Sequence, residues 1–520
     1  NNQQDIANST GSFTVNSTEL TNNGTISSEG TLAITATNAL TNNGDINSTD
    51  NGTLSAATLS NHGHINGSGD TLAINSTTLT NQGTILQAST GALTVNATTI
   101  NNTSQDDNQG QLLSNGSIDL VSSTITNKGL LSAGSALTVA SGSLTNEQQV
   151  FSRAGTIALD IDNDITNTGV IAATSNITLA AARANNSNGE IQSNANISLD
   201  AEQINVGQLF GDNVTVSTTN DLTVNSDEQI SAENDINLTS THKLINHGII
   251  TSANNATVNA QSIDNTQLLS ANHLTVNANS LTNNGTVNGQ SALSLNVNDT
   301  VNHNTLSAGS ELNVSGNITN NNVIFSDGSM TIAGNIANSQ QGEIVANEIQ
   351  LNSQQLDNAG LIYASEQLSI AGGALSQLTN SGTITSTNQL NAQSSTIDNI
   401  GAITASILQL NAETTLSNEG LIYAQTSARV DTSALTNQSQ IVSEQLTLTA
   451  AQIDNSDEIS AGVFIANFTQ QFLNSGTIET SQARFSGEQL SNTAQGRIIN
   501  LVEVASGEVA SGSLVFATNV

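Results

Sequence analysis

Apolar residues recur along this chain in a fixed order that repeats about every 20 residues. In one clear repeat, together with the start of the next, these residues are Leu20, Ile26, Leu32, Ile34 and Leu40. Neither the 3.6-residue period of a helix nor a long strict alternation produces this spacing. The short alternating stretch at 32–36 predicts a brief strand, and the Gly, Asn, Ser and Thr residues around it predict turns.

Three short strands and three turns in each repeat predict one coil of a parallel β-helix. The fold class is therefore all-β, with three short strands per coil, about 19–20 residues per coil and roughly 25 coils. The first apolar position of the repeat can be followed from Leu20 through Val301 to Leu490. We therefore expect a single β-helical rod over residues 1–520.

Three segments depart from the regular repeat. The repeat that begins at Ile100 is longer than its neighbours, which predicts a loop insertion at 101–111. Residues 184–230 keep the apolar spacing but lose most of the Asn and Gly, so they predict degenerate coils. The coils at 460–520 are richer in Phe, which favours a bulkier core there over a cap. The Phe residues concerned are Phe464, Phe468, Phe472, Phe485 and Phe516.

Asn recurs two residues after the first apolar position of most repeats. The recurring residues are Asn22, Asn42, Asn61, Asn81, Asn127, Asn167, Asn246, Asn283, Asn358, Asn380, Asn399, Asn418 and Asn474. Stacked coils place equivalent residues above one another, so each amide can donate to the next amide along the column. We therefore predict a structural Asn ladder. The alternative is a row of amides that binds a ligand.

Gly recurs two residues after that Asn. The predicted turn glycines are Gly24, Gly44, Gly63, Gly83, Gly129, Gly169, Gly248, Gly285, Gly360, Gly382, Gly401, Gly420 and Gly476. A corner that needs a positive φ is the simplest reason for them, because glycine enters that region without Cβ strain. They precede no helix and no Lys, so they do not form a phosphate-binding loop.

The charge balance excludes several classes of partner. The chain has 42 acidic and 7 basic residues, and its formal net charge is −35. It therefore lacks the Lys and Arg that nucleic acids and anionic membrane surfaces require. No apolar run is long enough for membrane insertion. The chain has no Pro and no Cys, and Asn1 stands where Met would begin a gene product, so we expect a piece of a longer protein.

The acidic and histidine residues offer weak candidates for chemistry. The seven basic residues stand one at a time along the chain, so no catalytic cluster is evident and we predict no enzyme activity. Asp160, Asp162 and Asp164 alternate and could hold Ca²⁺, but they lack the Gly and the distal Glu of a calcium loop, so we favour a solvated edge. His62 and His64 are two residues apart but lack a third ligand, so we predict no metal site and no cofactor.

Two tyrosines are the candidate contact residues. Tyr363 and Tyr423 each follow an Ile at the same position of the repeat, so both should project outward on one face of the coils. Exposed Tyr is a frequent contact residue in protein interfaces. Contact with a protein or a glycan, or packing over the adjacent turn, would each account for them.

The sequence at 20–26, Leu-Thr-Asn-Asn-Gly-Thr-Ile, and the Leu-x-Ile-x-Ala pattern at 32–36 together resemble the filamentous haemagglutinin repeat. That repeat forms the shafts of large bacterial exoproteins of two-partner secretion. These include filamentous haemagglutinin adhesins and contact-dependent growth inhibition proteins. The resemblance is clearest at 12–100, 125–175 and 240–500. It implies a right-handed parallel β-helix that serves as an extended stalk.

The resemblance also implies partners and a location. Such a protein is exported through a dedicated outer-membrane transporter to the extracellular surface of a Gram-negative bacterium. The lack of Cys suits a chain that is threaded unfolded across the envelope. The Asn-Pro-Asn-Gly motif of the family's secretion domain needs Pro, which this chain lacks, and no toxin-like domain is present. No secretion or toxin residue is therefore carried over.

These observations favour a structural shaft that holds a distal binding or toxin domain away from the cell. In a second hypothesis, the side of the rod itself binds a protein or glycan receptor on another cell, with Tyr363 and Tyr423 as first suspects. A third hypothesis is a β-helical enzyme that degrades polysaccharides. It has the least support, because the acidic and basic residues form no cluster.

Overall fold

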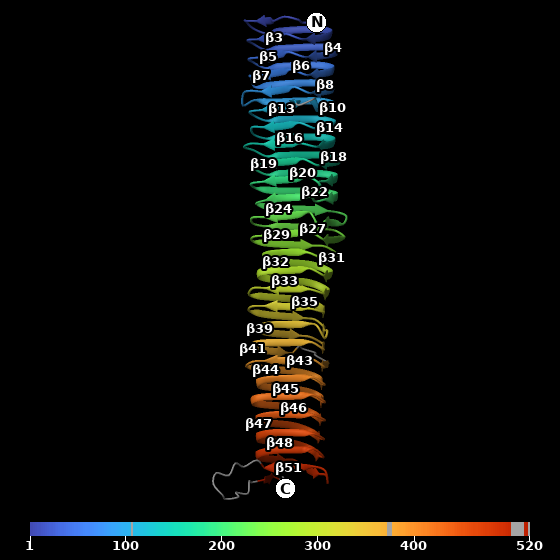
Figure 1. Ribbon diagram of the computed structural model, residues 1–520, viewed down its shortest axis with the longest axis vertical. Helices are drawn as coiled ribbons and strands as arrows, with labels where there is room; N and C mark the ends of the chain where they lie inside the picture. Colours follow the sequence, from blue (N-terminus) through green and yellow to red (C-terminus); the bar gives the residue numbers. More distant parts are fainter. Residues whose placement is uncertain (106–107, 372–376, 501–513, 518–520) are drawn as a thin grey trace. The chain divides into compact units, whose positions relative to one another are not determined.

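The computed structural model contains only β-strands as regular structure. It describes residues 1–105, 108–371, 377–500 and 514–517. No helix occurs among these residues. The strands form two compact units. Unit 1 comprises Asn1–Ser262 and Gln267–Leu269, and unit 2 comprises Ile263–Thr266 and Ser270–Val520. Within each unit, parallel strands from successive coils pair to form a β-solenoid, with about 25 turns in all (Figure 1). The predicted all-β, parallel β-helical fold is confirmed.

Each coil contains three straight β segments, which are joined to different extents along the chain. In unit 1, β4 (Leu32–Asn42) bends at a corner and provides two of the segments, and β5 (Asp45–Ser48) provides the third. The bend lies where the pairing of β4 with β6 (Gly52–Asn61) shifts in register. In part of unit 2, all three segments run on as one strand. These long strands include β33 (Thr286–Asn302), β45 (Ala402–Asn418), β46 (Leu421–Asn437), β47 (Gln440–Asn455) and β48 (Glu458–Asn474).

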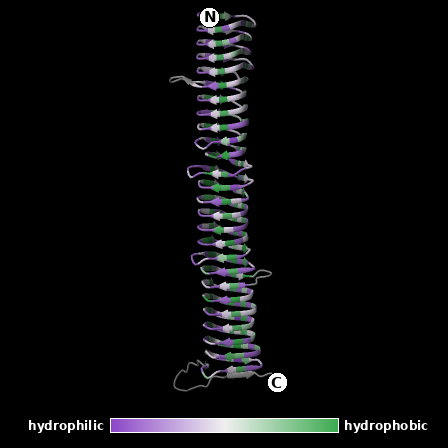
Figure 2. Cartoon of the chain, turned by 90° about the vertical axis from the view of Figure 1, so that its right-hand side faces the viewer, coloured by the Kyte–Doolittle hydropathy of each residue, from purple (hydrophilic) through white to green (hydrophobic). Residues whose placement is uncertain are grey.

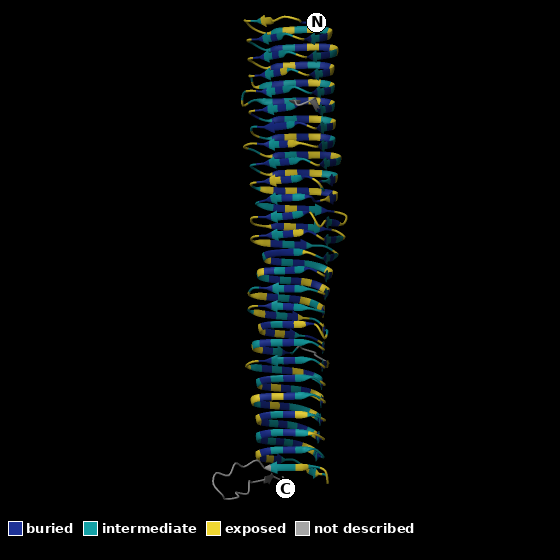
Figure 3. Cartoon of the chain, in the orientation of Figure 1, coloured by how far each residue is buried: buried dark blue, intermediate teal, exposed yellow. Residues whose placement is uncertain are grey.

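The core of each unit consists of columns of equivalent apolar side chains. Leu40 lies between Leu20 and Leu59 of the adjacent coils, and it is completely buried. Inward and outward residues alternate along each segment, which gives the bands of buried and exposed residues in Figure 3 and the hydrophobic bands in Figure 2. Burial of one Leu or Ile contributes about 1.5–3 kcal/mol. Fixing the backbone costs about 1–2 kcal/mol for every residue, and a coil has about 20 residues, so the few apolar side chains that one coil buries do not stabilise it alone. Each coil is therefore stabilised by its neighbours.

The coil length changes within residues 184–230. Asn196 of β22 (Asn196–Asn205) pairs with Asn213, only 17 residues later, whereas Val214 pairs with Ile236, 22 residues later. A short coil is thus followed by a long one, although the apolar residues stay buried. In unit 2 the sequence assignment of Val301 to the first apolar position is wrong. Thr300 occupies that position, because it pairs with Ile318 and is buried, and Val301 faces outward.

The two other irregular segments have clear local structure. After β10 (Ala92–Asn102), β11 (Ser104–Gln105) and β12 (Asn108–Gln109) form a two-stranded antiparallel ribbon outside the solenoid ladder. Near the C-terminus, the rings of Phe464 and Phe472 meet edge to face with their centroids 6.3 Å apart. Phe468 and Phe485 are buried against the same cluster. The side chain of Phe516 lies outside the described residues.

Candidate functional site

A column of buried Asn amides runs along each unit. Asn42 is fully buried, and its Nδ2 donates to Asn61 Oδ1 at 2.8 Å. Its own Oδ1 accepts from Asn22 Nδ2 at 2.8 Å. The same Nδ2 also donates to the backbone oxygens of Gly44 and His64. Each amide therefore joins three levels of the stack and satisfies backbone groups at the corner, which is a structural role.

Donor and acceptor of successive ladder amides are 2.6–2.9 Å apart in both units. In unit 1 the ladder comprises Asn2, Asn22, Asn42, Asn61, Asn81, Asn102, Asn127, Asn146, Asn167 and Asn186. In unit 2 it comprises Asn265, Asn283, Asn302, Asn320, Asn338, Asn358, Asn380, Asn399, Asn418, Asn437, Asn455, Asn474 and Asn492.

The structure brings more Asn residues into the ladder than the sequence pattern singled out. Asn146, for example, follows Leu144 at the ladder position but is not followed by Gly. An Asn two residues after the buried Leu or Ile is the sequence signal that identifies such residues. A following Gly is not needed. Asn246 was predicted as a ladder residue. Its Nδ2 donates to the backbone oxygen of Leu268 at 3.0 Å, and its Oδ1 accepts from the N–H of Gly248.

The unit 1 ladder ends where the coils become degenerate. Asn186 donates to the backbone oxygen of Val206 at 2.7 Å instead of to another amide. Val206 and Val224 are fully buried in the next two coils. Val224 pairs with Asn246 of the following coil, so it occupies the ladder position. Apolar packing thus replaces amide hydrogen bonds in these coils.

The reason predicted for the turn glycines is wrong. Among the described glycines, those with positive φ are Gly11, Gly207, Gly316 and Gly334. None of these is a predicted turn glycine. Close approach of the backbone explains the turn glycines instead, because a Cβ on Gly44 would overlap the carbonyl oxygen of Gly24. A Cβ would meet a backbone oxygen of the preceding coil in the same way at Gly24, Gly63, Gly83, Gly129, Gly169, Gly248, Gly360, Gly382, Gly401, Gly420 and Gly476. Gly285 lies at the same corner, where its N–H donates to Asn283 Oδ1.

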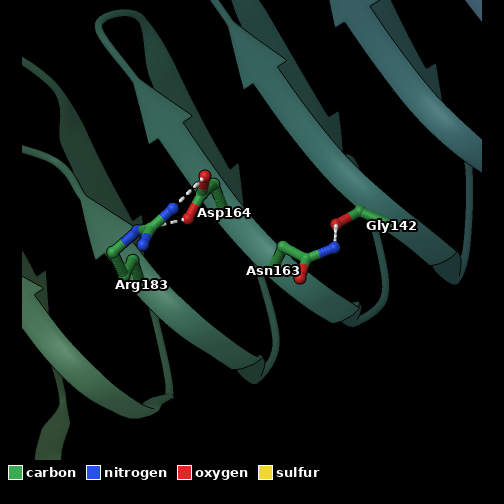
Figure 4. A network of polar contacts seen from close by, with 4 residues as sticks. All are labelled: Gly142, Asn163, Asp164 and Arg183. Carbon is green, nitrogen blue, oxygen red and sulfur yellow. Dashed lines mark hydrogen bonds and ion pairs between the residues drawn. The ribbon is translucent and has the colours of Figure 1, made fainter.

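Asp164 of the candidate calcium sequence is held by an arginine. Arg183 places Nε 2.6 Å from Oδ1 and Nη2 2.7 Å from Oδ2 of Asp164 (Figure 4). This hydrogen bond, together with the positive charge, holds the pKa of Asp164 below its usual value and raises the pKa of Arg183. Asp160 and Asp162 are exposed on the same segment. Nowhere in the described part of the chain do three acidic or histidine side chains gather as metal ligands.

The remaining polar candidates are dispersed. His62 and His64 are both exposed at a corner of unit 1. The Arg183–Asp164 pair borders a hollow of about 290 Å³ that is also lined by Asn185, Gln203 and Asn205. The two further ion pairs that can be described, Lys128–Glu147 and Arg429–Asp431, lie on the exposed surface. No arrangement of nucleophile, base and orienting group emerges from these residues.

The two tyrosines share one outward column of unit 2. Tyr363 lies in β41 (Leu361–Ile370) and pairs with Thr385, which pairs with Thr404, which in turn pairs with Tyr423 of β46. They are therefore three coils apart on the same face. Tyr363 is half-buried, whereas Tyr423 is 39% exposed.

Their surroundings differ. The hydroxyl of Tyr363 lies 3.2 Å from Thr387 Oγ1, within hydrogen-bonding distance. Tyr423 borders a hollow of about 280 Å³, which is also lined by Gln425, Val442, Glu444 and Ser460. The structure therefore separates the two candidate contact residues, because only one of them has its hydroxyl placed against a neighbouring side chain.

Sequence comparison places these features in a family. The chain matches the haemagglutinin repeat at residues 1–88, 88–169, 153–226 and 225–272, which together cover more than half of its length. The chain belongs to the haemagglutinin repeat family. The resemblance identified in the sequence is thus confirmed. No curated protein and no solved structure matches the chain.

Membership of the haemagglutinin repeat family indicates the general role and location of the protein. The family consists of structural and adhesive proteins rather than enzymes, and it implies a secreted or cell-surface protein. The coils of unit 2 beyond residue 272 contain an amide ladder and apolar columns of the same kind as those in the matched haemagglutinin repeats of unit 1. None of the described residues forms a helix long and apolar enough to cross a bilayer.

Proposed function

We propose that this chain is the structural shaft of a secreted adhesin-type protein and that it extends a distal binding or toxin domain away from the cell. The observation that carries this proposal is the use of the repeated residues. The apolar columns and the Asn ladder face inward and bind coil to coil, so the most regular part of the sequence is committed to stacking. The haemagglutinin repeats and the solenoid fit a filamentous adhesin-like shaft.

The proposal includes the route to the cell surface. We propose that an outer-membrane transporter of the two-partner type exports the chain from a Gram-negative bacterium. The lack of Cys supports this route, because a chain without disulfides can cross the envelope unfolded and then fold coil by coil. The chain would then need no cofactor and no enzymatic step.

Removal of whole coils from the protein that carries this chain tests the shaft role. Leu40 and Ile165 lie in one core column, six coils apart. Deletion of residues 41–165 therefore preserves the register and shortens the stack by about 29 Å at 4.8 Å per coil. We expect the distal end to move closer to the cell, as measured by end-labelled electron microscopy, and adhesion to fall. Unchanged reach would contradict the proposal.

A second candidate function is recognition by the side of the solenoid. The observation in its favour is the exposed ring of Tyr423 beside a surface hollow. Binding of the isolated 520-residue chain to target cells tests it. Side recognition predicts such binding, whereas a pure shaft predicts binding only when the distal domain is attached.

A further inference from the structure

The hollow beside Tyr423 has the composition of a small recognition site. We call it the Tyr423 hollow and define it by Tyr423, Gln425, Val442, Glu444 and Ser460. It combines an aromatic ring, an aliphatic side chain, an amide, a hydroxyl and a carboxylate. A partly apolar concavity with a few polar groups is typical of binding sites. All of these residues lie on β46, β47 and β48 of unit 2.

The two strongest interacting groups in the Tyr423 hollow have no partner of their own. Among the described residues, neither the Tyr423 hydroxyl nor the Glu444 carboxylate makes a hydrogen bond or an ion pair. The corresponding hydroxyl of Tyr363 lies against Thr387. An exposed carboxylate and phenol that bind nothing in the protein remain available to a ligand.

The backbone of the next coil makes room for the carboxylate. Glu444 lies over Gly462, since a Cβ built on Gly462 would stand only 2.7 Å from Glu444 Oε1. Any larger residue at position 462 would push this carboxylate away. Gly462 therefore helps to shape the Tyr423 hollow, although it belongs to none of the turn positions discussed above.

The negative charge around the Tyr423 hollow favours a cationic ligand. Tyr423, Val442, Ser460 and Glu479 follow one another in a single outward column, so a second carboxylate lies one coil beyond the Tyr423 hollow. The formal net charge of the whole chain is −35. An anionic ligand would be repelled by this field, whereas a cation would be attracted to it.

We propose that the Tyr423 hollow binds a basic side chain, an Arg or Lys, presented by a partner protein. The cation packs over the electron-rich face of Tyr423 and makes a charge-assisted hydrogen bond to Glu444. The methylene stem of the basic residue lies along Val442. This inference rests on the second candidate function, side recognition, and names the chemistry of its partner.

The full chain provides its own reporter for a test. It contains two Tyr and no Trp, so in the Tyr363→Phe variant Tyr423 is the single source of tyrosine fluorescence. The probe is a short peptide with one arginine, and its control is the same peptide with neutral citrulline in place of arginine. We expect the arginine peptide to change the fluorescence of Tyr423 saturably and the citrulline peptide to leave it unchanged.

Two charge variants in that background locate the contact. Glu444→Gln should weaken binding of the arginine peptide roughly two- to fivefold, the range for one exposed ion pair or cation–π contact. Glu419→Gln removes the same charge at another exposed corner and should have no effect. Equal effects of the two variants, equal binding of the citrulline peptide, or a response to a neutral oligosaccharide alone would each overturn the proposal. Cell binding by the isolated chain is measured separately, so failure here would leave side recognition itself standing.

Discussion

Replacement of a single ladder amide gives the sharpest test of what holds the coils together. In Asn42→Ala, the Oδ1 of Asn61 loses its donor and Asn22 loses its acceptor. The backbone oxygens of Gly44 and His64 lose the bonds that Nδ2 provided. The two amide–amide contacts are buried, where water cannot readily replace the missing partner, and the two contacts to backbone oxygens are partly buried.

The magnitude follows from these contacts. A hydrogen bond contributes about 1 kcal/mol net, and a buried acceptor left without its donor costs about 1–3 kcal/mol. Asn22 keeps its second bond, to the backbone oxygen of Asp45, which limits the loss. We therefore expect Asn42→Ala to destabilise the surrounding coils by about 3 kcal/mol.

Hydrogen exchange measured peptide by peptide is the suitable assay. In a stacked repeat each coil contacts only its neighbours, so the loss should be confined to the coils around residue 42. A loss of about 3 kcal/mol corresponds to roughly a hundredfold faster exchange through local opening. The matched control is Asn43→Ala, since Asn43 is exposed and its side-chain amide donates only to the exposed Asn23. Equal exchange in the two variants would refute the ladder account.

Three further variants test other features. Gly44→Ala should lower the free energy of unfolding by about 1–3 kcal/mol, because the added Cβ overlaps the Gly24 oxygen. An unchanged free energy in denaturant unfolding would contradict the close-approach explanation. Phe472→Ala should cost about 3–5 kcal/mol by emptying the aromatic cluster, and a thermal melt of the C-terminal coils will show it. The lowered pKa of Asp164 stabilises the fold above the unfolded pKa of about 3.9, and this contribution disappears as pH falls through the folded pKa. Arg183→Met should therefore melt lower than the parent near pH 5 and converge with it at lower pH, whereas a constant difference would exclude this ion pair as the cause.

Burial was predictable because it follows directly from the spacing of Leu and Ile. Leu20, Ile34 and Leu40 are inward because strands alternate and coils stack in register. The prediction of burial was wrong where a polar residue occupies a core position. Thr300 is buried at an apolar position, and its identity gave no sign of that role.

The glycine prediction failed for a different reason. A sequence reveals that a residue without Cβ is needed, but φ strain and close backbone approach both select glycine. Only the position of the Gly24 oxygen relative to Gly44 separates the two. The Tyr423 hollow could not be predicted from the sequence for a similar reason. The matching positions of Tyr363 and Tyr423 could be read from the sequence, but the placement of Glu444 over Gly462 depends on contacts between coils.

The amide ladder has a direction, and this makes the two ends of a stack chemically different. From Asn2 to Asn186, every side-chain N–H is aimed toward the next coil in the sequence, so the amide dipoles add along the column. An uncapped leading coil would offer a carbonyl oxygen, and an uncapped trailing coil would offer an N–H. Asn492 is the last ladder residue that the structure describes in unit 2, and its Nδ2 donates to the backbone oxygen of Gly496, as Asn338 does to Gly342 within the column. Two such stacks meeting head to head would oppose like dipoles, so the ladder itself disfavours symmetric end-to-end pairing.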